Sequence, residues 1–389
     1  MLDRGLTPTY DASGLAGVMP AVLRSLGVAD PAADRDDPPD LLDLLPARRS
    51  VVVLIDGLGY DLLRRRSGHA PFLRGLLPSA YRLCAGFPST TATSMGTFGT
   101  GLPPGAHGLV GYEVLVPGED RLLNELSWDS GPEPRLWQPS QTVFERAAAD
   151  GMAVTRIGPG FFDGSGLTNA ALRGGVFTAA HSLEARVDAA LTAVRASRRS
   201  LVYLYWGQLD KVGHVHGCQS WEWGDELELI DRSLARLMAG VPSDTSVHVT
   251  ADHGMVDAPH ALRIDLAHDD ELAGGVRHVG GEPRSLQLYC EPGATSDVLA
   301  TWRERVDARA WVLSRDEAVG QGLFGAVSQH VLPRIGDVIV AMRDNFAIVD
   351  SRTARPKLLA LLGLHGSLTP EEMAIPLFQI AARDSAKGL

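Results

Sequence analysis

The sequence predicts an α/β fold with a mostly parallel central sheet flanked by helices, and a small α+β insertion towards its C-terminal end. Two observations lead to this prediction. Between Ser50 and Thr250, apolar strand-like runs alternate with helical patterns, which is typical of parallel sheets with crossover helices. The runs at residues 51–55 and 201–206 are apolar at nearly every position, as expected of strands that are covered on both faces. After about Ala258 the alternation stops.

The first part of the chain contains short predicted elements. Apolar residues at helical spacing predict a helix at residues 14–26, and a Pro- and Asp-rich composition predicts a loop at 30–40. After the strand at 51–55, the pattern predicts two short helices, a helix of small residues and a Pro/Gly-rich loop, at residues 60–66, 72–77, 91–100 and 102–108.

The middle of the chain continues the alternation with longer helices. The helix predicted at residues 182–196 has Leu183, Val187 and Leu191 on one face and charged residues on the other. The remaining elements predicted here are helices at 141–150 and 226–239 and strands at 153–157, 201–206 and 246–250.

The insertion is predicted where the rhythm changes. Short segments at residues 285–289, 296–306, 310–313 and 338–341 suggest a small α+β unit. We therefore divide the chain into a catalytic core, residues 1–260 and 341–389, and an insertion or cap subdomain, residues 261–340. Residues 346–349 and the tail from Lys357 are expected to return to the core.

Composition limits the classes of function. The chain of 389 residues has 36 basic and 47 acidic residues, so its net charge is −11. Nucleic acids and anionic membranes are bound by basic surfaces, so we expect neither as a partner. A small anionic substrate remains compatible with this charge, because bound metal ions reverse the local potential. The oligomeric state cannot be read from the sequence.

The cysteines and the N-terminus bear on location. Cys84, Cys218 and Cys290 are far apart and lack C-x-x-C spacing, so they predict neither a disulfide framework nor a thiolate zinc site. The sequence shows no signal-peptide pattern and no run of 18 apolar residues. We therefore expect a soluble, cytoplasmic enzyme.

Carboxylates follow three of the predicted strands. Asp56 comes directly after the first strand, Asp210 follows residues 201–206, and Asp252 follows residues 246–250. In an open α/β sheet, ligands bind outside the carboxyl ends of the strands, so these three groups should meet there. Carboxylates packed together need a proton or a cation among them. The neighbouring His214 and His253 favour a transition metal over calcium, because imidazole suits zinc, iron or manganese.

A hydroxyl-rich stretch precedes the small-residue helix. Residues 87–94 read Phe-Pro-Ser-Thr-Thr-Ala-Thr-Ser, and such residues before a helix commonly form its N-cap. A threonine at a helix N-terminus can also act as a nucleophile, because the backbone N–H groups and the helix dipole favour a phosphate oxygen beside it. The residues alone do not choose among Thr90, Thr91 and Thr93.

Together, these stretches resemble the alkaline phosphatase superfamily and, within it, the nucleotide pyrophosphatase/phosphodiesterase branch. The matching segments are residues 52–57, 87–108 (FPSTTATSMGTFGTGLPPGAHG), 205–214, 250–255 and 364–376 (LHGSLTPEEMAIP). The resemblance implies an alkaline phosphatase-like core and a small-molecule phosphate ester as substrate, with a phosphodiester or nucleotide pyrophosphate bond hydrolysed through a phospho-threonine.

The resemblance also implies a site with two zinc ions. Thr91 would be the nucleophile and would itself contact the metal. One zinc would be held by Asp210, His214 and His365, and the other by Asp56, Asp252 and His253. His278, in a Gly-rich loop, is the alternative to His365 as the third ligand of the first of these zinc ions. Tyr112 stands where the branch's nucleotide pyrophosphatases have an asparagine that contacts a phosphate oxygen, so we expect Tyr112 to contact substrate and nucleotide specificity to differ.

Other functions share parts of this pattern. A phosphonate hydrolase also uses a threonine in a similar FPSTT-type stretch, and a phosphomonoesterase would need an additional cation, for which Lys211, Arg277 and Arg284 are candidates. The stretch from Cys84 to Pro88 does not fit a sulfatase motif. A function of a different class is a non-catalytic metal-binding protein with the same fold, which would bind metal through these ligands but hydrolyse no substrate.

Overall fold

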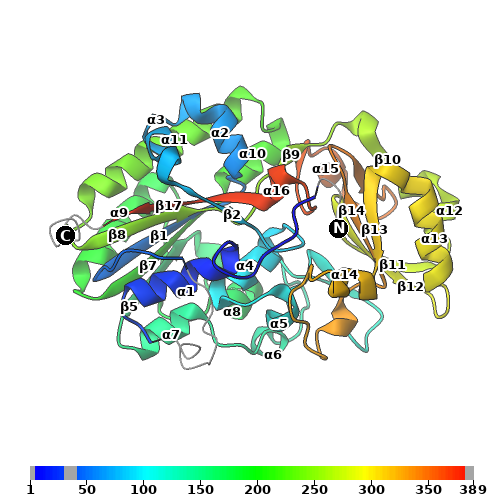
Figure 1. Ribbon diagram of the computed structural model, residues 1–389, viewed down its shortest axis with the longest axis horizontal. Helices are drawn as coiled ribbons and strands as arrows, with labels where there is room; N and C mark the ends of the chain where they lie inside the picture. Colours follow the sequence, from blue (N-terminus) through cyan, green and yellow to red (C-terminus); the bar gives the residue numbers. More distant parts are fainter. Residues whose placement is uncertain (1–4, 30–41, 382–389) are drawn as a thin grey trace.

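A seven-stranded sheet in the order β2-β17-β8-β1-β7-β5-β6 forms the centre of the protein (Figure 1). The structure, a computed structural model, describes residues 5–29 and 42–381, so the predicted loop at 30–40 lies outside the described residues. Strands β8, β1, β7, β5 and β6 run parallel, and β17 is antiparallel to both of its neighbours. The strands span β1 (Arg49–Ile55), β2 (Tyr81–Cys84), β5 (Ala153–Gly158), β6 (Val176–Ala179), β7 (Ser200–Trp206), β8 (Thr245–Thr250) and β17 (Ala374–Ile380).

The register of the central strands brings their carboxyl ends to one edge. Ile55 at the end of β1 lies opposite Trp206 of β7, and Leu54 lies opposite Thr250 of β8. Six of the seven residues of β1 are buried, which explains why the strand is apolar throughout. The loops after these three strands therefore leave the sheet side by side.

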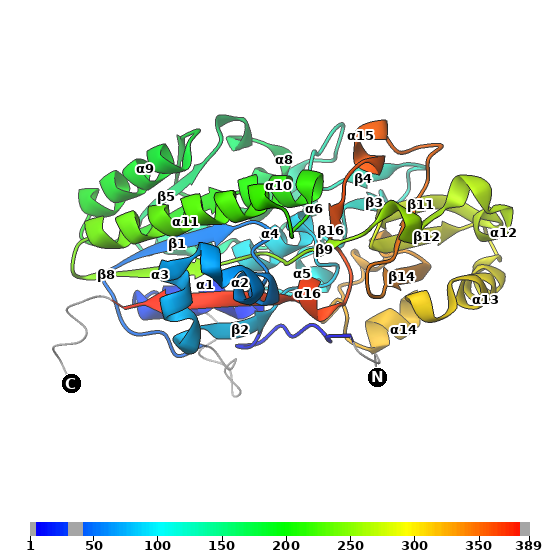
Figure 2. The ribbon, with the colours of Figure 1, turned by 90° about the horizontal axis from the view of Figure 1, so that it is seen from above.

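Helices cover both faces of the sheet (Figure 1), and Figure 2 looks down on one of the two layers. One layer consists of α2 (Tyr60–Arg66), α3 (Pro71–Leu76), α9 (Leu183–Ala196), α10 (Gln208–His216) and α11 (Trp221–Gly240). The opposite layer consists of α1 (Leu15–Ser25), α4 (Thr91–Thr100), α7 (Val143–Ala149) and α8 (Gly166–Ala171). The rings of Phe98 and Phe144 pack on Tyr203 of β7 with centroids 5.4 and 5.5 Å away, so this layer is fixed to the sheet by aromatic contacts.

The predicted α/β class and most predicted elements are confirmed. Helix α11 begins at Trp221 rather than at residue 226, because the Ser220 hydroxyl accepts a hydrogen bond from the Trp223 N–H (3.2 Å) and caps the helix earlier. The edge strands β2 and β6 were not predicted. Their residues are largely exposed or half-buried, so they lack the continuous apolar signal of the central strands.

A second sheet forms the unit on the right of Figure 1. It is antiparallel, in the order β11-β12-β14-β13, with α13 (Thr295–Val306) packed against it. Trp302 of α13 is fully buried in its own apolar cluster with Leu288 and Val340. The strands span β11 (Val276–Glu282), β12 (Ser285–Cys290), β13 (Ala310–Ser314) and β14 (Val338–Met342). The division of the chain at residues 261 and 340 stays a prediction.

One segment differs from its expected place. We expected residues 346–349 to return to the core, but β15 (Ala347–Val349) pairs with β10 (Arg263–Asp265), and Ile348 joins the apolar cluster of the second unit. The tail does return, because β17 enters the central sheet. The smaller elements are α5 (Pro104–His107), α6 (Pro134–Trp137), α12 (Asp270–Ala273), α14 (Arg315–Gly320), α15 (Pro356–Leu359), α16 (Pro370–Met373), β3 (Glu113–Leu115), β4 (Leu122–Asn124), β9 (Val256–Asp257) and β16 (Gly363–Leu364).

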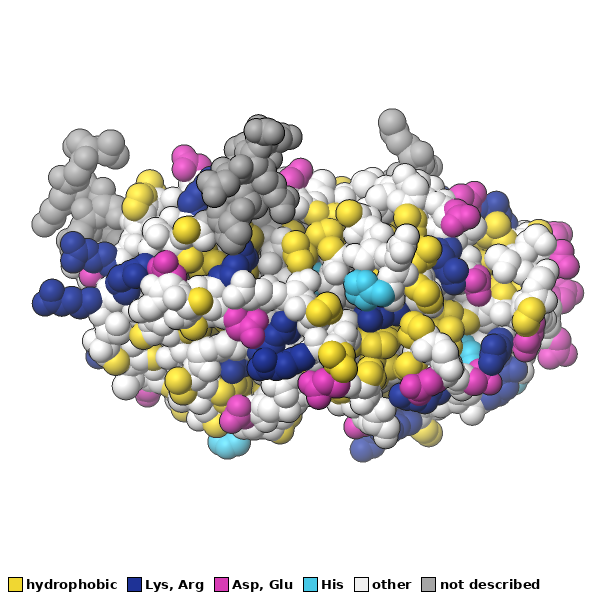
Figure 3. All heavy atoms as spheres, turned by 90° about the horizontal axis from the view of Figure 1, so that it is seen from below, with side chains coloured by type: hydrophobic (Ala, Val, Ile, Leu, Met, Phe, Trp, Pro, Cys, Tyr) yellow, Lys and Arg dark blue, Asp and Glu magenta, His cyan; other side chains and the backbone are white. Residues whose placement is uncertain are grey.

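Basic and acidic side chains are interspersed over the face shown in Figure 3, which carries no continuous basic surface. Within the described ranges, no helix has the length and apolar character that a membrane crossing requires.

His248 of β8 should make the stability of the fold sensitive to acid. Its ring is fully buried, neither ring nitrogen has a hydrogen-bond partner among the described residues, and burial lowers its pKa from 6.5 to about 4. Below pH 6.5 this histidine binds a proton in the unfolded chain but not in the folded protein. The free energy of unfolding therefore falls as the pH drops towards 4. We expect His248→Leu to flatten this dependence by about 1 kcal/mol per pH unit, measured by urea unfolding. Parallel curves for the two proteins would contradict the prediction.

Candidate functional site

The three strand-end aspartates meet at the carboxyl edge of the sheet. Asp56 follows β1, Asp252 follows β8, and Asp210 lies in the first turn of α10, which follows β7. The backbone N–H of Gly57 donates a hydrogen bond to Asp252 Oδ1 (3.1 Å). Gly57 has a φ of +73°, and a Cβ there would lie 3.2 Å from the Cα of Asp210. Glycine therefore allows the turn after β1 both its left-handed conformation and its close approach to α10.

Asp56, Asp252 and His253 form a first group of possible metal ligands. All three side chains are buried. His253 Nε2 lies 3.3 Å from Asp56 Oδ1 and 3.4 Å from Asp252 Oδ2. Two carboxylates and one imidazole thus direct one atom each towards a common point.

Asp210, His214 and His365 form a second group. His214 lies one helical turn after Asp210 on α10, with Nε2 3.3 Å from Asp210 Oδ2. His365 follows β16, which pairs with β9 just beyond His253, and its Nε2 lies 3.8 Å from Asp210 Oδ1. The rings of His365 and His253 stack with centroids 3.7 Å apart, so the two groups adjoin.

Backbone carbonyl groups orient the three histidines in the same way. The Nδ1 atoms of His214, His253 and His365 lie 2.7, 2.9 and 2.9 Å from the carbonyl oxygens of Gly363, Gly254 and Ser89 respectively. A ring that donates from Nδ1 keeps the Nε2 lone pair free, and this is the arrangement in which an imidazole binds a metal. In each case Nε2 is the atom that faces the aspartates.

The charge state of the site also fits cations. Asp56 Oδ1, Asp210 Oδ1 and Asp252 Oδ2 are buried and have no hydrogen-bond partner among the described residues. Burial, followed by repulsion from Asp252 and Asp210, raises the pKa of Asp56 well above its ordinary value. Burial likewise raises the pKa of Asp252. Divalent cations between the groups would satisfy these oxygens and remove the repulsion, so the donor set fits two metal ions.

Thr91 lies beside the first group. It is the first residue of α4, and its Oγ1 lies 3.2 Å from His253 Nε2. Thr90 is the N-cap residue, and its side chain makes no capping hydrogen bond. Thr93 is completely buried. Among the three threonines that the sequence left open, the structure therefore brings the Thr91 hydroxyl to the candidate ligands.

A cavity of about 610 Å³ opens from this point. Asp56, Thr91 and Asp210 line one part of it. The Tyr205 hydroxyl, also in its wall, donates a hydrogen bond to Asp56 Oδ2. Much of the remaining lining is aromatic or cationic and comprises Phe161, Phe162, Phe177, Tyr203, Trp206, Arg156, Arg186 and Lys211. A substrate with its phosphate group at the aspartates would thus place its organic part in a largely aromatic space.

Several other predicted residues lie outside the two groups. His278 contacts Asp120 through Nε2 (2.5 Å) rather than the aspartates, and Arg277 pairs with the same carboxylate. Arg284 is fully buried in an ion pair with Glu372 (2.6 Å). The side chain of Tyr112 interacts with Asn124 and is absent from the lining of the 610 Å³ cavity. Its proposed contact with substrate stays a prediction.

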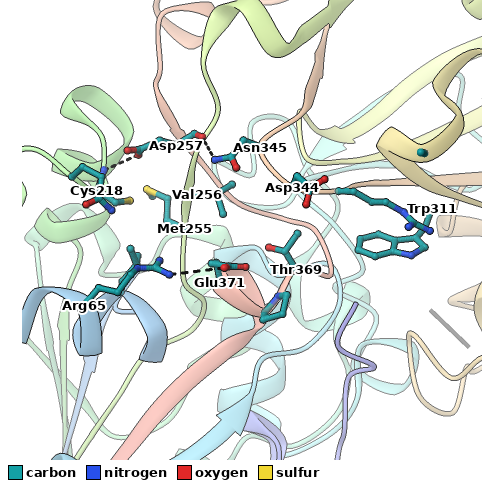
Figure 4. Close-up of a pocket in the computed structure, with 15 residues that line it drawn as sticks. Arg65, Cys218, Met255, Val256, Asp257, Trp311, Asp344, Asn345, Thr369 and Glu371 are labelled. Carbon is teal, nitrogen blue, oxygen red and sulfur yellow. Dashed lines mark hydrogen bonds and ion pairs between the residues drawn. The ribbon is translucent and has the colours of Figure 1, made fainter. Parts of the chain in front are cut away.

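A second cavity, of about 650 Å³, lies between the core and the second unit (Figure 4). Arg65 and Glu371, on one side of it, form an ion pair at 3.9 Å, and Asp257 accepts a hydrogen bond from the backbone of Cys218 (2.7 Å). Neither Thr91 nor any member of the two ligand groups lines this cavity. This second cavity is therefore separate from the two ligand groups and from Thr91.

Three polar side chains at the site have no recognisable signal in the sequence. These are Tyr205, Ser94, whose hydroxyl donates to the Asp252 carbonyl (2.9 Å), and Glu282, whose Oε2 lies 3.8 Å from His365 Nδ1. Tyr205 occurs in an apolar run, where its polar atom gave no separate signal. Glu282 ends β11 of the second sheet, and only the packing of that unit against the core brings it to His365.

The sequence also matches a known protein family. The model of the family described as type I phosphodiesterase/nucleotide pyrophosphatase matches residues 50–368. No curated protein sequence matches the chain.

Among solved structures, the chain is similar to murine ectonucleotide pyrophosphatase/phosphodiesterase 5, in an inactive form with AMP, at 18% identity and a TM-score of 0.70, over 86% of this chain and 90% of that one. It is also similar to the human ectonucleotide pyrophosphatase/phosphodiesterase 5, at 17% identity and a TM-score of 0.65, over 85% of this chain and 87% of that one. A third similar structure is a phosphonoacetate hydrolase from Sinorhizobium meliloti in complex with phosphonoacetate. It is 20% identical, with a TM-score of 0.66, over 86% of this chain and 91% of that one. The family match extends over most of the chain and includes both ligand groups, so the protein belongs to the type I phosphodiesterase/nucleotide pyrophosphatase family of hydrolases.

Proposed function

We propose that the protein hydrolyses phosphodiester or nucleotide pyrophosphate bonds of small molecules through a phosphorylated Thr91, at a site that binds two zinc ions. The observation that carries this proposal is the position of Thr91 Oγ1, 3.2 Å from His253 Nε2 and next to both ligand groups. The AMP bound to the murine relative supports a nucleotide-like substrate.

The surroundings of Thr91 favour its role as nucleophile. As the first residue of α4, it lies where unpaired backbone N–H groups and the positive end of the helix dipole attract a phosphate oxygen. Its hydroxyl would attack phosphorus in line and expel the leaving alcohol or phosphate. Water would then hydrolyse the phospho-threonine and restore the hydroxyl.

The two ligand groups would hold the metal ions, one in each. Zinc bound there would act as a Lewis acid and lower the pKa of the Thr91 hydroxyl. The buried aspartates and the oriented imidazoles supply the hard and borderline donors that zinc accepts. Tyr205 would keep Asp56 in place through its hydrogen bond.

A phosphonate hydrolase is the second candidate. The similarity to the phosphonoacetate hydrolase is close in extent to that with the ectonucleotide enzymes, so the shared fold does not separate the two activities. A substrate panel of bis-p-nitrophenyl phosphate, p-nitrophenyl phosphate, a dinucleotide pyrophosphate and phosphonoacetate separates them. We expect turnover of the diester or pyrophosphate to exceed that of the others.

Removal of metal should abolish the activity reversibly. We expect EDTA to reduce turnover of bis-p-nitrophenyl phosphate by about a thousandfold, with zinc restoring it better than magnesium, because magnesium prefers an all-oxygen, octahedral set of ligands. Metal analysis accompanies the assay. Better recovery with magnesium than with zinc would contradict zinc as the bound metal. If both sites contain metal and no substrate is turned over, the proposed hydrolase activity is wrong.

A further inference from the structure

An arginine is buried in the wall of the 610 Å³ cavity. Arg156 lies in the middle of β5, and only 8% of its surface is exposed. It lines the same cavity as Thr91 and Asp210. Arginine is almost never so buried in a globular protein unless it is paired.

The described part of the fold supplies no hydrogen-bond partner for two nitrogens of Arg156. Its Nε and Nη1 atoms are buried, and neither makes a hydrogen bond in the part of the chain that the structure describes. The guanidinium lies 5.7 Å from the centre of the Phe177 ring. The exposed Asp163 acts on it electrostatically, and burial lowers the pKa of Arg156 nonetheless. The guanidinium group of a residue that lines the cavity thus has two nitrogens whose hydrogen bonds are not made within the fold, and an anion bound in the cavity would supply an acceptor for this group.

A second buried arginine in the same cavity shows what a structural role looks like. Arg186 donates from Nε to the Ala180 carbonyl (2.9 Å), from Nη1 to the Tyr205 carbonyl (2.6 Å) and from Nη2 to the His181 carbonyl (3.3 Å). All three of its nitrogens are used to hold the backbone together. Arg156 makes no comparable set of bonds, although it lies in the same wall.

The register of the sheet places Arg156 away from the metal edge. Arg156 lies opposite Tyr203 of β7, which in turn lies opposite Val52 of β1, four residues before Asp56. At about 3.3 Å per residue, this is about 13 Å along the strands. A group bound by Arg156 would therefore belong to the organic part of a substrate and not to the phosphate under attack.

We propose that Arg156 binds a second anionic group of the substrate, a carboxylate or a phosphate, carried on an aromatic or apolar group that fills the cavity. This inference rests on the proposed function, because it assumes that the reacting phosphate lies at Thr91. A guanidinium group in a wall shielded from water makes strong, directional bonds with such an anion. Arg156 would thus determine specificity without contacting the reacting atoms.

The test compares three diesters that share a 4-nitrophenyl group and differ in the other ester group: phenyl, carboxyphenyl or phosphonophenyl. The kcat/KM of each is measured for the wild type, Arg156→Met and Arg156→Lys. We expect the wild type to prefer one of the anionic esters and Arg156→Met to lose at least about tenfold of that preference. Arg156→Lys keeps the charge and should retain part of it. Which ester is preferred identifies the anion.

Controls separate binding from folding. Arg199→Met removes an exposed arginine that pairs with Asp150 (2.6 Å) and should leave the preference unchanged. The melting temperature of Arg156→Met should equal or exceed that of the wild type, because an unpaired buried charge is removed. A lower melting temperature with an unchanged preference would show a structural role and overturn the inference.

The outcomes distinguish this inference from the proposed function. Turnover of all three esters with the same preference in the wild type and Arg156→Met would overturn the role of Arg156 alone. If the wild type turns over none of them, the proposed function fails. Calorimetric titration with carboxyphenylphosphonate and phenylphosphonate then decides: at least tenfold tighter binding of the former, lost in Arg156→Met, would support the anion site, and equal affinities would overturn it.

Discussion

Thr91→Ala should reduce kcat/KM for bis-p-nitrophenyl phosphate by about a thousandfold or more and leave the metal content unchanged. The hydroxyl is the attacking group in the proposed mechanism, and losing it removes roughly 4 kcal/mol of transition-state stabilisation. Neither ligand group includes this residue in its set of three, so metal binding should persist. Stopped assays and metal analysis of the same preparation measure both effects.

Three further variants, Thr91→Ser, Thr90→Ala and Thr93→Ala, make the assignment of the nucleophile specific. Thr91→Ser keeps a hydroxyl at the same position and should recover a large part of the activity. Thr90→Ala tests the adjacent N-cap residue, whose side chain caps nothing, and should retain most of it. Activity that survives in Thr91→Ala but is lost in Thr90→Ala or Thr93→Ala would move the nucleophile to that residue.

The strand-end aspartates could be predicted because their positions depend on topology alone. Parallel strands place their carboxyl ends at one edge, so Asp56, Asp210 and Asp252 had to be neighbours once the α/β order was recognised. The nearby His214 and His253 are carried along by the same segments, one turn of helix or one residue away.

His365 shows where such reasoning stops. Its position depends on the pairing of β16 with β9, and on a contact of its Nδ1 with the Ser89 carbonyl, 276 residues away in the sequence. No local pattern encodes these contacts, so only the family resemblance selected His365 over His278. The structure places His365 in the second ligand group and His278 beside Asp120.

Arg156 illustrates a different limit. A charged residue inside the strand predicted at 153–157 is visible in the sequence, but β5 has neighbours on both sides and helices near both faces. The period-2 alternation that would assign its side chain to one face is missing in such strands. Only the structure shows that Arg156 faces the cavity that Thr91 also lines.

His365→Ala should remove the metal ion of the second group while the first group retains most of its own. His365 supplies one of three donors beside Asp210 and His214, and a site with two ligands should bind zinc at least ~100-fold more weakly. We therefore expect a loss of about half of the bound zinc and a loss of turnover of about a thousandfold. The His365 ring is buried and its Nδ1 bonds to the Ser89 carbonyl, so some stability should be lost as well.

The matched control is His278→Ala, which removes a histidine bonded to Asp120 and should change neither zinc content nor kcat. If His278→Ala loses zinc and His365→Ala keeps both metal ions, then His278 and not His365 is the third ligand of the second metal.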